Sequence, residues 1–478
     1  MRLSINPSPQ LFLIIILSIG IILRFYNINY DDLWYDEIIS FWVSNPEHLL
    51  TESLKIHKDI EIAPFTFNLF LRFFYQIFGY EVDFARYLPS FFSVLTIFVA
   101  YKLAKLLDKN NSFLVVATLV SLNIFLINYA QEQRVYSILI FFSCLSLLFF
   151  FKLLKKNIKF FDTFIFFSAT LILVSLHLFS LFIVFSYFVY LGLIFLKEKK
   201  IFFKLNIILG IILIVSLAFY IPYILSFSEN LNSNLDVNYS WNKNPSLKFF
   251  SNFYFSNYFG SRIMGLVFLL TLFFLIYKNK SMFINLEKHM LILIIVFMSY
   301  FIPICFGYLF KPILLPRYIS YTVVLIIILI ASLLFKIKST NLKIFTISFL
   351  ILITIGNMFT EQAFKQFYKK RVLGKPAYTQ AVRYINSSST KNYSLKIEKM
   401  KNNTATSNAI INYIQHLNKK HNTKIKFIGY DKVSYQSVWI LCPIDINKKT
   451  CPLPNEVKKF RVLKEVYFNS INLKLIQK

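Results

Sequence analysis

The sequence predicts an all-α polytopic membrane bundle of about eleven transmembrane helices, followed by a small C-terminal external α/β domain. Of the 478 residues, 56% are hydrophobic and only 16% are charged, whereas roughly a quarter are charged in soluble domains. Apolar stretches of about the 20 residues that a spanning helix needs recur along the chain. The last 120 residues are instead polar and have no such stretch. This composition excludes a soluble enzyme, a disordered protein and a disulfide scaffold.

The eleven expected spans are separated by short polar connections. They lie near 10–28, 86–107, 112–128, 135–153, 161–177, 179–196, 205–226, 262–277, 290–309, 318–335 and 342–358. The first stretch has the apolar core of a secretion signal, but it is followed by Arg24 and an aromatic, polar segment without a small-residue cleavage site. We therefore interpret it as a retained span.

Lysines predict the topology, because short loops rich in Lys and Arg stay in the cytoplasm. We number the spans along the chain from a cytoplasmic N-terminus. The connections that follow even-numbered spans then lie in the cytoplasm, and these are the basic ones. They carry seventeen lysines: Lys102, Lys105, Lys109, Lys152, Lys155, Lys156, Lys159, Lys197, Lys199, Lys200, Lys204, Lys278, Lys280, Lys288, Lys336, Lys338 and Lys343. An odd number of spans then places the C-terminal domain on the periplasmic or extracellular side.

The net charge of +29 comes from 52 Lys and Arg against 23 Asp and Glu. Such an excess often indicates nucleic acid, but the positive mean hydropathy points to the membrane and not to nucleic acid. Ten of the acids lie between Asp31 and Asp83, in a predicted first external loop over 29–85. Loops this long in a compact protein are usually functional. Within it, 65–79 is apolar and aromatic and predicts a helix along the membrane interface.

Residues 1–358 are thus expected to form the transmembrane module and 359–478 the external domain. In the latter, 394–400, 423–429, 437–442 and 471–476 read as strands, and 377–385 and 407–418 as helices. Its 23 Lys and Arg against 6 Asp and Glu suit an anionic surface or substrate, or equally a solvated surface. Cys442 and Cys451 are candidates for a disulfide in an external compartment, the alternative being two free thiols.

The strongest local cluster is DDLWYDEIISFW at 31–42, directly after the first span. Asp36 and Glu37 are adjacent, so in a regular element they point in different directions and cannot act on one atom. One of them is expected to face a cleft while the other caps a helix or accepts backbone N–H bonds. Two interpretations of Asp36 stay open, a catalytic carboxylate and an N-cap for a helix that begins at Glu37.

Further ionisable residues lie at the outer ends of other spans. Glu132 and Arg134 either line a site or pair to lock their loop. Lys311 and Arg317, beside two prolines, suit a lipid-linked phosphate, the alternative being contact with lipid headgroups. His177 lies alone at an outer turn, where a hydrogen-bonded structural role is more common than a ligand role.

On these residues the chain resembles integral-membrane glycosyltransferases of the C-type fold, in the bacterial branch related to protein O-mannosyltransferases and lipid A aminoarabinose transferases. Five segments carry the resemblance in the expected order and on the expected side of the membrane. They are WYDE at 34–37, the run EIAPFTFNLFLRFFYQIFG at 61–79 followed by ARYLPSFFSVLTIFVAYKLAKLL at 85–107, YAQEQRVYSILIFF from 129, LHLFSLF at 176–182 and LPRYI at 315–319.

The resemblance implies a hexosyl- or pentosyltransferase of the bacterial inner membrane that uses a sugar on a polyprenyl phosphate and acts on a lipid, glycan or protein acceptor at the outer face. It implies that Asp36 is the base, Glu37 its motif partner and Glu61 a second acidic site residue. The implied substrate-binding residues are Glu61, Arg86, Glu132, Arg134, Tyr136, His177, Lys311, Arg317 and Tyr318.

One departure concerns Ile62, which stands where the family often has His or Lys before Pro-Pro and which cannot contact a phosphate or a metal. No cofactor is firmly implied; a divalent metal ion, if one is bound, would be held by Asp36 and Glu61. The chain has only 10 glycines and no Gly-rich phosphate loop, in keeping with a lipid-linked donor instead of a nucleotide.

Two other functions stay open. One is a transporter or flippase for a lipid-linked glycan, which usually has internal repeats and ionisable residues at mid-membrane; here the acids gather at one surface. The other is a glycan polymerase or ligase with a diphosphate-linked donor, which would share the site and differ in the donor.

Overall fold

The computed structural model describes residues 8–60, 64–108, 111–155, 159–233, 255–280, 288–310, 312–359, 374–388, 394–397, 404–427, 437–444 and 460–477. The chain forms two compact units. We call Met1–Tyr26, Ile62–Phe67 and Pro89–Phe367 the helical unit, and Asn27–Glu61, Asn68–Leu88 and Tyr368–Lys478 the loop–sheet unit.

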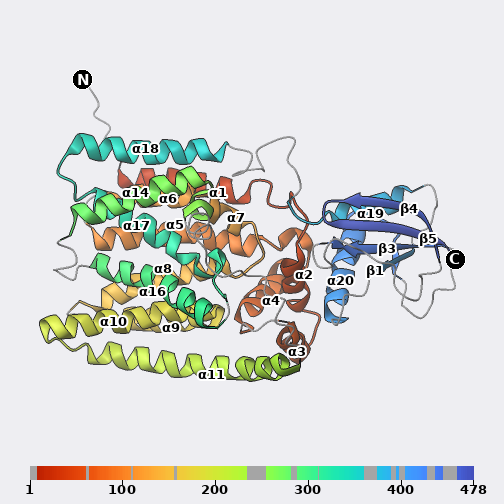
Figure 1. Cartoon of the computed structure of the whole chain (residues 1–478), viewed down its shortest axis with the longest axis horizontal. Coiled ribbons are helices and arrows are strands. Elements are labelled where there is room, and N and C mark those ends of the chain that lie inside the picture. Colours follow the sequence, from red (N-terminus) through yellow and green to blue (C-terminus); the bar gives the residue numbers. More distant parts are fainter. Residues whose placement is uncertain are drawn as a thin grey trace. The chain divides into compact units, whose positions relative to one another are not determined.

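The helical unit is a bundle of long apolar helices (Figure 1). Its elements are α1 (Pro9–Phe25), α5 (Tyr87–Leu107, from Pro89 onward), α6 (Ser112–Leu122), α7 (Ile124–Ala130), α8 (Tyr136–Leu153), α9 (Phe160–Leu176), η2 (Leu178–Ser180), α10 (Leu181–Glu198), α11 (Phe203–Ser233), α13 (Phe255–Phe259), α14 (Arg262–Lys278), α16 (Lys288–Leu309), η3 (Pro316–Ile319), α17 (Tyr321–Leu334) and α18 (Thr340–Met358). Every residue of α17 is buried. Because a helix that is hydrophobic all round belongs inside a bundle, α17 forms the centre, packed against α6, α8, α14 and α16.

A helix lies at each of the eleven predicted positions. Six described helices are long and apolar enough to cross a membrane, or seven if the bent pair α6 and α7 is one span. The chain is therefore a multi-pass membrane protein, while the count of eleven spans is not confirmed. The difference of four arises because α1, α9 and α17 are apolar but short and α14 has only 17 residues; hydropathy alone does not show where a helix ends.

The α6–α7 pair is bent by 56°, and Arg24 of α1 lies against the bend. Asn123 breaks the helix because its side chain accepts the Leu126 N–H at 3.0 Å and so caps α7. The break frees carbonyls at the end of α6. The buried Arg24 guanidinium donates to two of them, Val120 and Ser121, each at 3.0 Å. Backbone carbonyl oxygens thus accept hydrogen bonds from a guanidinium that is buried in an apolar bundle.

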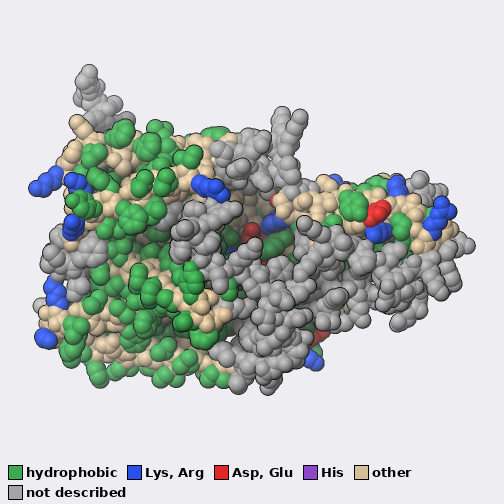
Figure 2. Space-filling view, in the orientation of Figure 1, with side chains coloured by type: hydrophobic (Ala, Val, Ile, Leu, Met, Phe, Trp, Pro, Cys, Tyr) green, Lys and Arg blue, Asp and Glu red, His purple; other side chains and the backbone are tan. Residues whose placement is uncertain are grey.

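Lysines mark one end of the helical unit. Lys288, at the start of α16, donates to the Leu106 carbonyl at the end of α5 at 3.2 Å and lies over the Phe151 ring near the end of α8. Figure 2 shows hydrophobic side chains over the visible face of the helices, with most of the visible Lys and Arg of this unit at the end where α10 connects to α11. The membrane side on which this end lies stays a prediction.

The loop–sheet unit combines the acidic loop with the C-terminal segment. The loop forms α2 (Tyr35–Val43), α3 (Leu50–Ile60), α4 (Thr66–Phe78, in this unit from Asn68) and η1 (Val82–Phe84). On α4, Leu71 and Tyr75 are buried, whereas Leu69, Phe73 and Ile77 are exposed on the opposite face. This apolar exposed stripe suits the predicted interfacial helix.

The C-terminal segment forms α19 (Tyr378–Ser387), α20 (Thr404–Lys420) and five strands: β1 (Ser394–Ile397), β2 (Lys426–Phe427), β3 (Ser437–Pro443), β4 (Arg461–Phe468) and β5 (Ile471–Gln477). The strand order is β2-β1-β3-β5-β4. β1 is parallel to β2 and β3, and β5 is antiparallel to β3 and β4. All predicted strands and helices are present, but β4 was not predicted, because it is a mostly exposed edge strand with a charged sequence. Cys442 is disulfide-bonded; Cys451 lies outside the described residues.

Candidate functional site

Helix α2 places the Asp-Glu motif in its first turn. The helix begins at Tyr35, with Trp34 as the N-cap, and the Glu37 carboxylate accepts the Trp34 N–H at 3.2 Å. The interpretation of Asp36 as the N-cap was therefore wrong, because Asp36 lies one residue inside the helix. Two acids in a first turn also suit the positive end of the helix dipole.

Glu37 is fully buried, and two cations surround it. Arg86 donates from Nε to Oε1 at 2.9 Å and from Nη2 to Oε2 at 3.1 Å. Lys375 donates to Oε2 at 2.7 Å. Burial by itself would raise the pKa of Glu37, but the charges of Arg86 and Lys375 outweigh burial and hold this pKa well below its usual range. Glu37 is therefore a permanent carboxylate at neutral pH.

Arg86 has no donor left over for a substrate. Besides its two bonds to Glu37, it donates to the backbone carbonyls of Ile28 (3.0 Å), Asp31 (2.9 Å) and Asp32 (2.9 Å). These bonds use all five N–H donors of a guanidinium. The side chain is only 3% exposed. Arg86 therefore holds the 28–32 backbone and Glu37 in one fixed arrangement.

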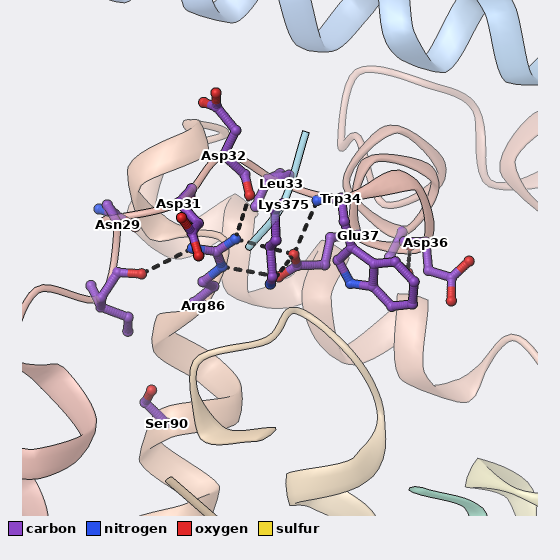
Figure 3. A network of polar contacts seen from close by, with 12 residues as sticks. Asn29, Asp31, Asp32, Leu33, Trp34, Asp36, Glu37, Arg86, Ser90 and Lys375 are labelled. Atoms are coloured by element: carbon purple, nitrogen blue, oxygen red, sulfur yellow. Dashed lines mark hydrogen bonds and ion pairs between the residues drawn. The ribbon is translucent and has the colours of Figure 1, made fainter. Parts of the chain in front are cut away.

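Asp36 lies apart from this ion network. Figure 3 shows its carboxylate pointing away from Arg86, beside the Trp34 ring, while the Glu37 carboxylate points toward Arg86 and Lys375. Asp36 is half-buried. The adjacent acids therefore point in different directions, as predicted, and Glu37 is the one that accepts a backbone N–H. The half-buried Asp36 is thus the acid of the motif that these two cations do not enclose.

The neighbouring Asp32 joins the loop to the C-terminal segment. Its carboxylate accepts the Thr379 N–H at 2.7 Å and the Tyr413 hydroxyl at 3.1 Å, and it also accepts the Thr379 hydroxyl. Thr379 lies in the first turn of α19, so Asp32 caps that helix from a distant part of the sequence. The Tyr413 hydroxyl in turn accepts the Leu33 N–H at 3.0 Å.

A second cluster of predicted residues forms within the helical unit, where η2 and η3 are in contact. The His177 and Tyr318 rings are 4.9 Å apart between centroids. The Arg317 guanidinium carbon lies 5.6 Å from the Tyr318 ring centroid and 6.0 Å from that of Tyr136. His177 Nδ1 accepts the Phe179 N–H at 3.2 Å. His177 thus has the structural hydrogen bond expected of it, and its ring packs beside Tyr318, the ring that Arg317 also faces.

Glu132 and Arg134 lie in the connection between α7 and α8, a few residues before Tyr136. The Arg134 N–H donates to the Glu132 carbonyl at 2.8 Å. The preceding Gln131 donates to the carbonyls of Arg24 (3.0 Å) and Tyr26 (3.2 Å), which ties the connection to the end of α1. Both Glu132 and Arg134 are half-buried.

Two predicted residues, Glu61 and Lys311, lie outside the described residues, and so does the Ile62 position. Among the residues that the structure describes, no group of three or more His, Cys, Asp or Glu could hold a metal ion. Lys375 was missed by sequence reasoning. Nothing distinguishes it within a lysine-rich tail, since its partner is 338 positions away.

No protein-family profile and no curated protein sequence matches the chain. Solved structures do. ArnT from Cupriavidus metallidurans in the apo state matches with a TM-score of 0.60 and 12% identity, over 98% of this chain and 97% of that one. The same protein bound to undecaprenyl phosphate matches with a TM-score of 0.59 and 10% identity, over 98% of each chain.

The oligosaccharyltransferase of Archaeoglobus fulgidus in the apo form is also similar. It matches with a TM-score of 0.55 and 10% identity, over 85% of this chain and 64% of that one. At these identities the likeness concerns the fold. The chain thus has the fold of C-type glycosyltransferases, as its sequence motifs predicted.

Proposed function

We propose that this protein is an inverting glycosyltransferase of the bacterial inner membrane. It would move a sugar from a polyprenyl-phosphate donor to a lipid, glycan or protein acceptor at the external face. The observation that carries the proposal is that the two adjacent acids of the Asp-Glu motif lie in different environments. Arg86 and Lys375 enclose Glu37, whereas the half-buried Asp36 carboxylate points away from both cations, beside the Trp34 ring.

The proposed reaction needs one base and one cation. The acceptor hydroxyl oxygen bonds to the anomeric carbon while the bond from that carbon to the phosphate oxygen breaks. Asp36 takes the hydroxyl proton, and polyprenyl phosphate leaves. Because no enzyme group bonds to the sugar, one displacement inverts the anomeric carbon.

Arg317 is the proposed phosphate ligand. A guanidinium can bind two phosphate oxygens at once and stabilise the charge that develops on the leaving group. The Tyr318 and Tyr136 rings lie beside the Arg317 guanidinium and limit the orientations that this side chain can adopt. Arg134 and Lys311 would add cations, and Glu132, His177 and Glu61 would contact the sugar or the acceptor. A metal ion, if one takes part, would be held by Asp36 and Glu61.

The comparisons support the donor class. One similar structure, ArnT, is described with bound undecaprenyl phosphate. Another, the archaeal oligosaccharyltransferase AglB, is described with a dolichol phosphate and an inhibitory peptide. A lipid phosphate is therefore the ligand to test first.

The first experiment compares outer glycolipids and glycoproteins by mass spectrometry in cells that lack the gene and are complemented with wild type or Asp36→Asn. We expect a sugar modification with wild type and none with Asp36→Asn at equal protein level. Asp83→Asn is the control, because Asp83 is an exposed acid of the same loop that pairs with Lys420. Full modification by Asp36→Asn would overturn the proposed base.

Purified protein in vesicles separates the alternatives. Transfer from a monophosphate-linked donor supports the proposal, and transfer only from a diphosphate-linked donor indicates a polymerase or ligase. Movement of labelled lipid-linked sugar across the vesicle membrane without transfer would indicate a flippase.

A further inference from the structure

The C-terminal segment is bonded directly to the motif that holds the proposed base. Lys375 reaches the buried Glu37 Oε2, the same oxygen that accepts the Trp34 N–H at the start of α2. Glu37 and Asp36 are adjacent in the first turn of α2. A shift of the Glu37 carboxylate would therefore change the start of the helix on which Asp36 lies.

Lys375 is itself held in place by the sheet. Its backbone carbonyl accepts the Asn469 side-chain amide at 2.7 Å. The Ala377 N–H donates to the Asn469 carbonyl at 3.0 Å. Asn469 begins the tight turn between β4 and β5, in which Ser470 has a left-handed backbone (φ 56°). A continuous path of bonds thus runs from this turn through Lys375 and Glu37 to α2.

Neutralising Glu37 does not require Lys375, because Arg86 already forms a two-bond ion pair with this carboxylate. The lysine side chain is 17% exposed, compared with 0% for Glu37. Lys375 adds a second, shorter bond to Oε2. Because the Lys375 backbone is bonded to Asn469, this bond links the sheet to the motif.

We propose that Lys375 is a positioning residue through which the C-terminal segment sets the orientation of Asp36. The inference rests on the proposed function, since it assigns Asp36 as the base. It also makes a purely structural claim that holds whatever the reaction is: loss of the Lys375 ammonium loosens the first turn of α2.

Activity is tested with Lys375→Met and Lys375→Arg in the full-length protein. We expect Lys375→Met to lower kcat about tenfold with KM nearly unchanged, the loss expected for one charge-assisted hydrogen bond that aligns the base. Lys375→Arg keeps the cation and should restore most of kcat. Lys419→Met is the matched control, because Lys419 also joins α20 to the loop through an ion pair with Glu81, but at an exposed position.

The pH profile distinguishes positioning from general destabilisation. Without Lys375, one of the cations that depress the pKa of Glu37 is absent. Glu37 should then take up a proton at a higher pH than in wild type, so the acid limb of kcat should move to higher pH. Lys419→Met should leave this limb in place. An unchanged acid limb in Lys375→Met, together with no recovery of kcat in Lys375→Arg, would overturn the positioning role.

Hydrogen exchange separates failure of this inference from failure of the proposed function. Amides of 35–40 should exchange faster in Lys375→Met than in wild type or Lys419→Met. If the protein transfers no sugar but these amides respond as expected, the proposed function fails and the structural link stands. If exchange and kcat in Lys375→Met equal those of wild type, the link itself is overturned. Should Lys375→Met not fold, Asn469→Ala, which releases the lysine backbone, replaces it with the same expectations.

Discussion

The Arg86 guanidinium and the Glu37 carboxylate form a two-bond ion pair, with Nε to Oε1 at 2.9 Å and Nη2 to Oε2 at 3.1 Å. Both side chains are buried, at 3% and 0% exposure. The pair connects the residue that precedes α5 to the first turn of α2. Removing one member of such a pair leaves an uncompensated buried charge, and this is costly.

Glu37→Gln should lower the free energy of unfolding by about 3 kcal/mol, because Arg86 would lose the carboxylate to which it is bonded while remaining enclosed. Thermal unfolding in detergent would show this as a lower Tm. Glu81→Gln is the control: it breaks an exposed pair with Lys419, which contributes no more than about 1 kcal/mol. Equal Tm values for both variants would contradict the role of the buried pair.

Stability should also depend on pH through Glu37. Its folded-state pKa is depressed below the ordinary value of 4.5, so the unfolded chain binds a proton before the folded chain does. The stabilisation by Glu37 is therefore fully present above pH 4.5 and is lost as pH falls toward the folded-state pKa. A Tm series from pH 7 to pH 3 should fall more steeply in wild type than in Glu37→Gln. Parallel curves would show that Glu37 does not titrate in this range.

Arg317→Lys should lower kcat/KM about 100-fold while the protein stays folded. The lysine keeps the charge but loses the planar fork that binds two phosphate oxygens, and loss of one such stabilising contact typically costs this much. The assay is sugar transfer from the lipid-phosphate donor. Arg262→Lys is the control, because Arg262 is an exposed arginine at the start of α14. Wild-type activity in Arg317→Lys would remove Arg317 from the phosphate site.

Much of the fold was predictable from local composition. Each expected span contains a helix, because a long apolar run can satisfy its backbone in a membrane only as a helix or a closed barrel. The strand β4 was missed because edge strands lack the apolar alternation that marks a half-buried strand. The bend after α6 was hidden as well, since Asn123 acts through a single cap within an otherwise apolar run.

The candidate site was predictable in part. Residue types and order pointed to Asp36, Glu37, Arg86 and Arg317, and the structure gathers Tyr136, His177, Arg317 and Tyr318 within one unit. Which acid of the adjacent pair is enclosed did not follow from spacing. Two neighbours on a helix always diverge, and only the partners on each side decide which one is buried.

The sequence by itself determined that this is a multi-span membrane protein with an acidic loop and a basic tail, because hydropathy and charge act locally and can be read position by position. Only the tertiary structure decided that Lys375, in that tail, joins Arg86 around Glu37. An ion pair between residues 338 positions apart depends on how the chain folds back on itself, and a tail rich in interchangeable lysines does not show which one is enclosed.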